Sequence, residues 1–220
     1  MATLLHIDSS ALSQGSVSRE LTATYVREWQ AAHPEGTVVR RDLGAEPVPH
    51  LTEAGITAAF VPAEHRSPEQ QAAFALREEL MTELEQADAV VIGAPMYNFS
   101  IPSPLKAWLD QVILVGRTGG APDTTVAGKH VTVLASRGGS YAPGTPRADA
   151  EFAARYLETA LTGMMNVEVE TVAAEFTLAR VNPALAGFIE AGDASKAAAH
   201  EQAGQTARKV AARLTEPAAV

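Results

Sequence analysis

Residues 87–110 read "ADAVVIGAPMYNFSIPSPLKAWLD", and this stretch decides the fold class. Its first eight residues contain the continuous apolar run that is typical of a strand buried on both faces of a parallel sheet. From Ser103 onward, the apolar residues have helical spacing. A turn that only reversed the chain would use Gly, Asn, Asp or Ser. The aromatic and amide side chains between Pro95 and Pro102 therefore indicate a surface shaped to fit something flat.

The same alternation of apolar runs and helical patterns extends along the whole chain. We expect strands at Thr3–Ile7, Thr37–Arg41, Ala89–Ala94, His130–Ala135 and Val167–Ala173, and helices at 17–32, 67–86, 103–115, 149–164 and 193–214. Strands that alternate with helices form βαβ units, which build a parallel sheet with helices on both faces. Since no repeat, linker or change in composition divides the chain, we expect one domain over residues 1–220. The predicted fold class is α/β, a three-layer αβα sandwich around a five-stranded parallel sheet.

Charge and composition exclude several classes of function. The 220 residues carry a formal net charge of −9, and none of them is cysteine. Nucleic-acid binding needs a basic face, so the charge argues against it, although backbone amides can still bind a single phosphate. The lack of cysteine excludes thiol catalysis and Cys-ligated zinc. The six histidines have no metal-binding spacing, and we therefore expect no metal site.

The N-terminal residues "MATLLHIDSS" lack the basic and apolar segments of a signal peptide. No uncharged run approaches the length that spans a membrane. A chain without cysteine also fits a reducing compartment. We therefore expect a cytoplasmic protein with no membrane partner.

Residues 43–66 form a long irregular connection that contains three prolines. The segment carries no chemical signature. It is either a surface excursion or, as long loops often are, a functional lid or dimer contact. The sequence leaves both roles open.

The loop after the first strand is rich in serine. In an open parallel sheet, ligands bind beyond the carboxyl ends of the strands, at the point where the strand order reverses. Ser16 or Ser18 could cap the following helix, with Glu20 close enough to join in. Free amides and hydroxyls at a helix N-terminus suit an anion, here a terminal monophosphate, because the loop has no lysine. The alternative is a serine-rich turn that only caps a helix.

The loop after the fourth strand reads "SRGGSYAPGTP" at residues 136–146. Gly138 and Gly139 let backbone amides approach a ligand closely. Arg137 offers a fixed cation, and Tyr141 offers a flat face with a hydroxyl group. The alternative is an ordinary glycine-containing turn.

The loop after the third strand is the one quoted first. Asn98 offers both an amide donor and a carbonyl acceptor. Met96, Tyr97 and Phe99 could line a planar ring system, or they could be core residues of an irregular loop. Three unusual loops at one edge of one predicted sheet favour a site for a small molecule.

Together these loops resemble a known family. "SS" at 9–10, "SVS" at 16–18, "PMYNF" at 95–99 and "SRGG" at 136–139 resemble the FMN-dependent NADH-azoreductases, flavoproteins of flavodoxin-like fold related to the quinone reductases. The resemblance runs from residue 3 to about 176. It implies that the residues binding FMN non-covalently are Ser10, Ser16, Val17, Ser18, Pro95, Met96, Tyr97, Asn98, Phe99, Ser136, Arg137, Gly138, Gly139 and Tyr141.

The resemblance also assigns parts of the flavin to the three loops. Ser10 and residues 16–18 would hold the phosphate and ribityl end, residues 96–99 would run along the isoalloxazine, and residues 136–139 would lie at its pyrimidine side. Hydride transfer would take place at flavin N5 with Asn98 nearby, and no side chain would act as a catalytic acid or base. The amides of Gly138 and Gly139 would stabilise the negative charge of the reduced flavin.

Family members are homodimers that use NADH or NADPH to reduce quinones and azo compounds by ping-pong hydride transfer, and the resemblance implies the same here. Two segments depart from the family pattern: residues 116–127 are shorter and lack an aromatic, and residues 160–167 are less aromatic. Both segments help to cover the substrate in relatives, so the physiological acceptor stays open, as does the choice between NADH and NADPH. The extended C-terminal segment 178–220 has no functional interpretation.

Two other functions compete with the enzyme. A flavodoxin-like electron carrier would hold FMN and serve a partner protein, but carriers are more strongly acidic. A regulatory protein that had lost the flavin would not retain all three loops. Turnover of NADH with a soluble quinone separates an enzyme from a carrier.

Several other residues have structural interpretations. We expect His6 and His130, on predicted strands, to be core residues with satisfied rings. Lys106 and Asp110 are spaced as a surface ion pair on one helix. Trp108 would serve in packing or at a dimer interface.

Overall fold

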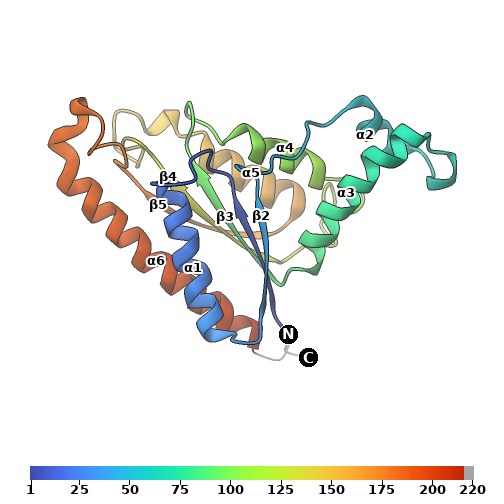
Figure 1. The fold of residues 1–220 in the computed structure, drawn as a ribbon, viewed down its shortest axis with the longest axis horizontal. Helices are drawn as coiled ribbons and strands as arrows, with labels where there is room; N and C mark the ends of the chain where they lie inside the picture. Colours follow the sequence, from blue (N-terminus) through green and yellow to red (C-terminus); the bar gives the residue numbers. More distant parts are fainter. Residues whose placement is uncertain (216–220) are drawn as a thin grey trace.

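Five parallel strands form one sheet, as the sequence predicts (Figure 1). The computed structural model describes residues 1–215, so residues 216–220, which end the expected domain 1–220 and the segment 178–220, lie outside the described residues. The strands are β1 Thr3–Asp8, β2 Thr37–Asp42, β3 Ala89–Pro95, β4 His130–Ser136 and β5 Glu168–Ala174. Their order across the sheet is β2-β1-β3-β4-β5. From β1 the chain adds β2 on one side, and from β3 it adds β4 and β5 on the other side. The strand order therefore reverses between β1 and β3.

The register brings the strand ends to one level. Asp8 pairs with Asp42 of β2 and with Gly93 of β3, while Pro95 at the end of β3 pairs with Ser136 at the end of β4. Because the strands are parallel, all of their carboxyl ends meet at the same edge of the sheet. The three loops singled out in the sequence leave β1, β3 and β4 there, around the point where ligands bind in this kind of sheet.

Helices cover both faces of the sheet, and Figure 1 shows α1 and α6 side by side on one face. The helices are α1 Val17–Ala32, α2 Glu53–Thr57, α3 Pro68–Gln86, α4 Ser103–Val112, α5 Ala153–Met165 and α6 Ile189–Thr215. The first and last pack against each other and share a core with one face of the sheet. Helices α3, α4 and α5 supply the core on the other face.

Each face of the sheet buries one tryptophan. Trp29 of α1 is fully buried in the first core, and Trp108 of α4 is 1 % exposed in the second. Burying an aromatic side chain of this size removes roughly 150–250 Å² of surface from water. Trp108 is therefore a packing residue inside the subunit, and its ring is not available at a dimer interface.

Several predicted boundaries move in the structure. Helix α4 ends at Val112 instead of residue 115 because Ile113 is extended and the Leu114 carbonyl accepts a turn of three following amides. Strand β5 begins at Glu168, two residues after Asn166 ends α5 in a left-handed conformation with φ 56°. Residues 43–66 are not wholly irregular, since they contain α2 and the 3-10 turns Ala58–Phe60 and Ala63–His65.

Helix α3 begins at Pro68 instead of residue 67, because Ser67 is its N-cap. The other two helices with shifted starts, α5 and α6, each follow a 3-10 turn. Helix α5 begins at Ala153 instead of residue 149, after the turn Ala148–Ala150. Helix α6 begins at Ile189 instead of residue 193, directly after the turn Pro183–Phe188. Before α5, the tighter turn occupies residues that the helical pattern alone could not separate from the helix, whereas α6 extends four residues further toward its N-terminus than the pattern predicts.

The interpretation of His6 and His130 as satisfied residues is wrong. The His6 side chain is buried and that of His130 is 11 % exposed, but among the described residues no ring nitrogen of either has a hydrogen-bond partner. His6 Nε2 lies 3.1 Å from an Asp8 carboxylate oxygen, without the geometry of a hydrogen bond. The predicted surface pair of Lys106 and Asp110 is confirmed.

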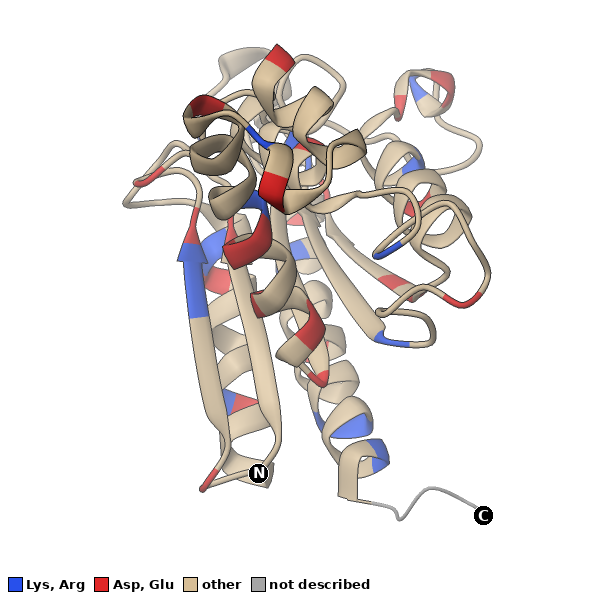
Figure 2. Ribbon diagram, turned by 90° about the vertical axis from the view of Figure 1, so that its right-hand side faces the viewer, with Lys and Arg blue, Asp and Glu red and all other residues tan. Residues whose placement is uncertain are grey.

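Charged residues of both signs are interspersed over the side of the molecule drawn in Figure 2, as a chain with net charge −9 allows. None of the helices within residues 1–215 combines the length and the apolar content needed to cross a membrane.

Candidate functional site

A pocket of about 190 Å³ lies at the carboxyl edge of the sheet, where the three predicted loops meet. Its lining consists of Ser10, Leu12, Gly15, Ser16, Val17, Pro95, Met96, Tyr97, Ser136, Gly138, Thr177 and Leu178. Each of the three loops contributes side chains or backbone to this one pocket. The C-terminal residues Thr177 and Leu178 complete the wall, and the sequence analysis did not include them.

The first loop ends in a capped helix N-terminus. The Ser16 hydroxyl accepts a hydrogen bond from the Arg19 amide at 3.5 Å and lies 3.2 Å from the Ser18 hydroxyl. The amides of Val17 and Ser18 donate to no group among the described residues. Free amides at the positive end of a helix dipole attract an anion. Glu20 does not join the cap, because it pairs with Lys196 of α6.

The second loop, which follows β3, is a tight hairpin with an unusual backbone. Tyr97 and Ser100 exchange amide-to-carbonyl hydrogen bonds of 2.9 and 3.0 Å. Between them, Asn98 and Phe99 both have positive φ angles, of 50° and 69°. Such a turn normally carries glycine, and a bulky residue in this conformation costs about 1 kcal/mol or more. Backbone strain of this kind concentrates at functional sites, and here it displays the Phe99 ring, which is 45 % exposed.

Tyr97 joins the second loop to the first. Its hydroxyl lies 3.4 Å from the Ser10 hydroxyl and accepts a hydrogen bond from the Ala11 amide at 3.2 Å. Met96, the neighbouring residue, donates its amide to the Ser136 carbonyl at 2.8 Å and so ties the second loop to β4. The pocket wall is therefore continuous across β1, β3 and β4.

The third loop, which follows β4, combines paired carbonyls with unpaired amides among the described residues. The carbonyls of residues 137–139 accept the amides of residues 176–178 at distances of 3.0 to 3.3 Å. The Gly138 and Gly139 amides donate to no group among the described residues. A Cβ at Gly138 would lie 2.6 Å from Leu178 Cδ1, so the close contact with Leu178 favours glycine there.

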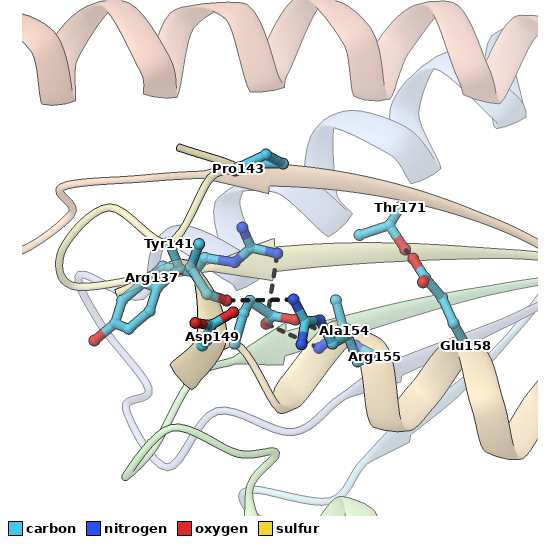
Figure 3. Close-up of a pocket in the computed structure, with 10 residues that line it drawn as sticks. Arg137, Tyr141, Pro143, Asp149, Ala154, Arg155, Glu158 and Thr171 are labelled. Atoms are coloured by element: carbon cyan, nitrogen blue, oxygen red, sulfur yellow. Dashed lines mark hydrogen bonds and ion pairs between the residues drawn. The ribbon is translucent and has the colours of Figure 1, made fainter. Parts of the chain in front are cut away.

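Arg137 does not present its guanidinium to this pocket. Its Nη atoms lie 3.5 Å from Glu151 and 3.3 Å from Glu175, and all three side chains are largely buried. Figure 3 shows Arg137 in a separate cavity of about 380 Å³, together with Arg155 and Glu158. The structure thus places the expected fixed cation in an ion-pair network behind the third loop.

Glu175 supports the third loop from below. Its carboxylate accepts hydrogen bonds from the Ser140 hydroxyl at 2.6 Å and from the Tyr141 amide at 2.9 Å. The sequence analysis missed Glu175 because its partners lie about 35 residues away. It also missed Glu151, which accepts the Ala154 and Arg155 amides at the start of α5. An acidic residue just before a helix is a recognised signal for this kind of cap.

Besides Arg137, five predicted residues lie beside the pocket instead of in its lining. Ser18 is buried beneath the first loop, and Asn98 and Phe99 lie at the hairpin tip. The Tyr141 ring packs edge-on against Phe99, with ring centroids 6.2 Å apart. Gly139 and Tyr141 also line a neighbouring cavity of about 560 Å³.

This chain is similar to known proteins over almost its whole length. Residues 2–210 match the family described as "Flavodoxin-like fold". The chain is 53 % identical to the FMN-dependent NADH:quinone oxidoreductase of Streptomyces avermitilis, over 97 % of this chain and 99 % of that protein. It is 50 % identical to the protein of the same name from Streptomyces coelicolor, over 98 % of each.

Solved structures agree with these relatives. The azoreductase of Bacillus anthracis str. Sterne superimposes with a TM-score of 0.81 at 26 % identity, over 95 % of this chain and 100 % of that one. Azoreductase AzrA gives the same TM-score and identity over 94 % of this chain and 100 % of that one. The strand order, the pocket position and these comparisons agree, and the chain belongs to the flavodoxin-like fold family.

Proposed function

We propose that this protein is an FMN-dependent NADH:quinone oxidoreductase that also reduces azo compounds. The observation that carries the proposal is the single pocket built by three loops at the carboxyl edge of the sheet, with unpaired amides in the first and third loops. The relatives that share half of their residues with this chain over nearly full length bear this name.

The residues present fit FMN. Unpaired amides of Val17 and Ser18, next to the hydroxyls of Ser10 and Ser16, suit a terminal phosphate. The Gly138 amide, which also has no partner among the described residues, suits a ring carbonyl. When bound, FMN supplies the two-electron hydride chemistry between NADH and the acceptor.

The protein contributes binding and orientation. Ser10, Ser16, Val17 and Ser18 would hold the phosphate and ribityl end. Pro95, Met96, Tyr97, Asn98 and Phe99 would run along the ring. Ser136, Gly138, Gly139 and Tyr141 would surround its pyrimidine side, together with the backbone of Arg137, whose guanidinium is turned away. The rigid hairpin at residues 97–100 would fix the ring plane, since its backbone is closed by two hydrogen bonds.

We also propose that the chain forms one FMN-binding domain and acts as a cytoplasmic homodimer. Large apolar side chains remain exposed on the single subunit, including Phe60, Val115 and Phe152 at 83 %, 71 % and 54 %. A second copy covering these side chains would remove their apolar surface from water. Light scattering coupled to size-exclusion chromatography would give twice the subunit mass, and a monomer would contradict the dimer.

Steady-state turnover tests the proposed activity. The purified protein with FMN and NADH should reduce a soluble quinone, and separately an azo dye, over many cycles without any partner protein. A flavodoxin-like electron carrier would bind FMN but would oxidise NADH poorly without its reductase. Flavin binding without NADH oxidation would therefore contradict the enzyme and support the carrier.

A further inference from the structure

Arg19 reaches under the first loop from the first turn of α1. Its Nε donates to the Leu12 carbonyl at 2.8 Å, and its Nη2 donates to the Ser10 carbonyl at 2.8 Å. The side chain is 19 % exposed. One guanidinium thus holds two carbonyls of the loop, and Arg19 is not among the residues that line the pocket.

Asp42 holds the other side of the same guanidinium. Its two carboxylate oxygens accept from Arg19 Nη1 and Nη2 at 2.6 and 2.7 Å, which is the bidentate geometry that only arginine provides. Asp42 is the last residue of β2, and it also accepts the amides of Gly44 and Ala45. The Arg19 hydrogen bonds lower the pKa of Asp42, so the pair stays charged at neutral pH.

The contacts of Arg19 set the direction of the loop amides. A peptide unit is planar and trans, so its carbonyl and its N–H point in opposite directions. Because the Ser10 carbonyl points to Arg19, the next amide, that of Ala11, points the other way, toward the Tyr97 hydroxyl. The Leu12 carbonyl likewise directs the Ser13 amide away from the guanidinium.

Arg19 also separates two carboxylates from the loop. Its Nη1 lies 3.5 Å from an Asp8 carboxylate oxygen, in addition to the pair with Asp42. Without this cation, two negative charges would stand behind a loop that is suited to an anion. Gly44 leaves the room that the arrangement needs, because a Cβ there would lie 1.9 Å from the Ser10 carbonyl oxygen and 2.8 Å from Arg19 Nη2.

We propose that Arg19, held by Asp42, is a positioning residue that shapes residues 9–16 for the phosphate of the flavin and thereby makes the protein prefer FMN to riboflavin. This inference rests on the proposed function, since it assumes that the first loop receives the FMN phosphate. Arg19 itself is paired by Asp42, so it acts through the loop and not as a ligand of the phosphate.

The test compares the affinities of flavin-depleted full-length protein for FMN and for riboflavin, which lacks the phosphate, by quenching of flavin fluorescence. Arg19→Ala and Asp42→Asn should each weaken FMN about tenfold or more and riboflavin by less than about threefold. Arg19→Lys should recover only part of the FMN affinity, because an ammonium group cannot bind Asp42 and both carbonyls together. Arg27→Ala is the matched control, since Arg27 lies on the same helix, is 66 % exposed and, within residues 1–215, forms an ion pair with Glu28 alone.

Circular dichroism of each variant confirms folding before the titrations. If Arg19→Ala does not fold, Asp42→Asn and Gly44→Ala test the same contact, the second by displacing the Ser10 carbonyl. Equal weakening of FMN and riboflavin, or unchanged FMN affinity, would overturn the positioning role while the wild-type protein still binds FMN. Failure of the wild-type protein to bind FMN would overturn the proposed function and this inference together.

Discussion

The loops that follow β1 and β4 border the same pocket but are supported by side chains of opposite charge. Behind the first loop, Arg19 donates to two loop carbonyls. Behind the third loop, Glu175 accepts from a loop hydroxyl and a loop amide. A cation that engages carbonyls leaves amides for an anion, whereas a carboxylate engages donors and brings negative charge nearby. The difference is consistent with our proposal that the first loop receives the anionic end of the flavin and the third loop its ring.

The largest effect is expected from removing the support of the third loop. Glu175→Ala would leave two loop donors without their acceptor and Arg137 with Glu151 as its only carboxylate partner. We expect a loss of roughly 3 kcal/mol in the free energy of unfolding, because two loop donors lose their acceptor and the largely buried Arg137 cation keeps only one of its two carboxylates. Urea denaturation measures this loss, and the flavin retained after gel filtration should fall as well.

Glu175→Gln is the matched variant, because it removes the charge but keeps one acceptor oxygen, for the Tyr141 amide or the Ser140 hydroxyl. Its loss of stability should be clearly smaller than that of Glu175→Ala. If both variants were as stable as the wild-type protein, the third loop would not depend on Glu175, and the contrast between the two loops would fail.

The next effect concerns the helix cap in the first loop. Ser16→Ala removes the side-chain acceptor at the start of α1 and should cost about 1 kcal/mol of stability. Ser67→Ala removes the corresponding cap of α3, where Ser67 accepts the Gln70 amide at 3.2 Å, and should cost a similar amount. Only Ser16→Ala should weaken FMN binding in a fluorescence titration. Equal flavin affinities in the two variants would show that the Ser16 hydroxyl only caps a helix.

The third effect concerns the pH dependence of stability and involves the amino ends of the strands, away from the loops that follow β1 and β4. His130, the first residue of β4, is buried near Glu168 and Glu170, and burial lowers the pKa of its imidazole. The unfolded chain, with a histidine pKa of about 6.5, then binds more protons than the folded chain once the pH falls below that value. Stability should therefore decline from about pH 6.5 downward through the folded pKa, by at most about 1.4 kcal/mol per pH unit.

Denaturation curves at several pH values measure this decline. His130→Gln should flatten the dependence below about pH 6.5. An unchanged slope in His130→Gln would assign the acid sensitivity to other groups.

The smallest effect is expected for the surface pair on α4. Lys106→Ala removes the ion pair with Asp110, in which both side chains are more than one third exposed. Such a pair contributes at most about 0.5 kcal/mol. Thermal unfolding and flavin affinity should both stay close to wild-type values, which provides the baseline for the loop variants.

The local pattern of apolar residues and helix caps was sufficient to predict most of the strands and helices. The apolar run at Ala89–Ala94 and the serine-capped helix at 17–32 both appear where the sequence predicts them. The pattern failed where a short turn replaced a helical segment, as at Ile113, because turn geometry there depends on hydrogen bonds to the Leu114 carbonyl.

The pocket could be predicted only in part, since a loop motif shows what faces the ligand and not what supports it. The chemistry of Tyr97 and Gly138 is visible in the sequence. Arg19, Glu175 and Leu178 are not recognisable in the same way, because their partners become neighbours only when β2, β4 and β5 align. Arg137 shows the converse error, a promising cation that the fold turns toward Glu151.

The most direct test of the account is the visible absorption spectrum of the purified protein, recorded before and after NADH is added without oxygen. The account predicts flavin bands that bleach with NADH and return when a quinone is added, which would establish the cofactor and both half-reactions. A protein that stays colourless after incubation with FMN would contradict the flavin site and the role of all three loops.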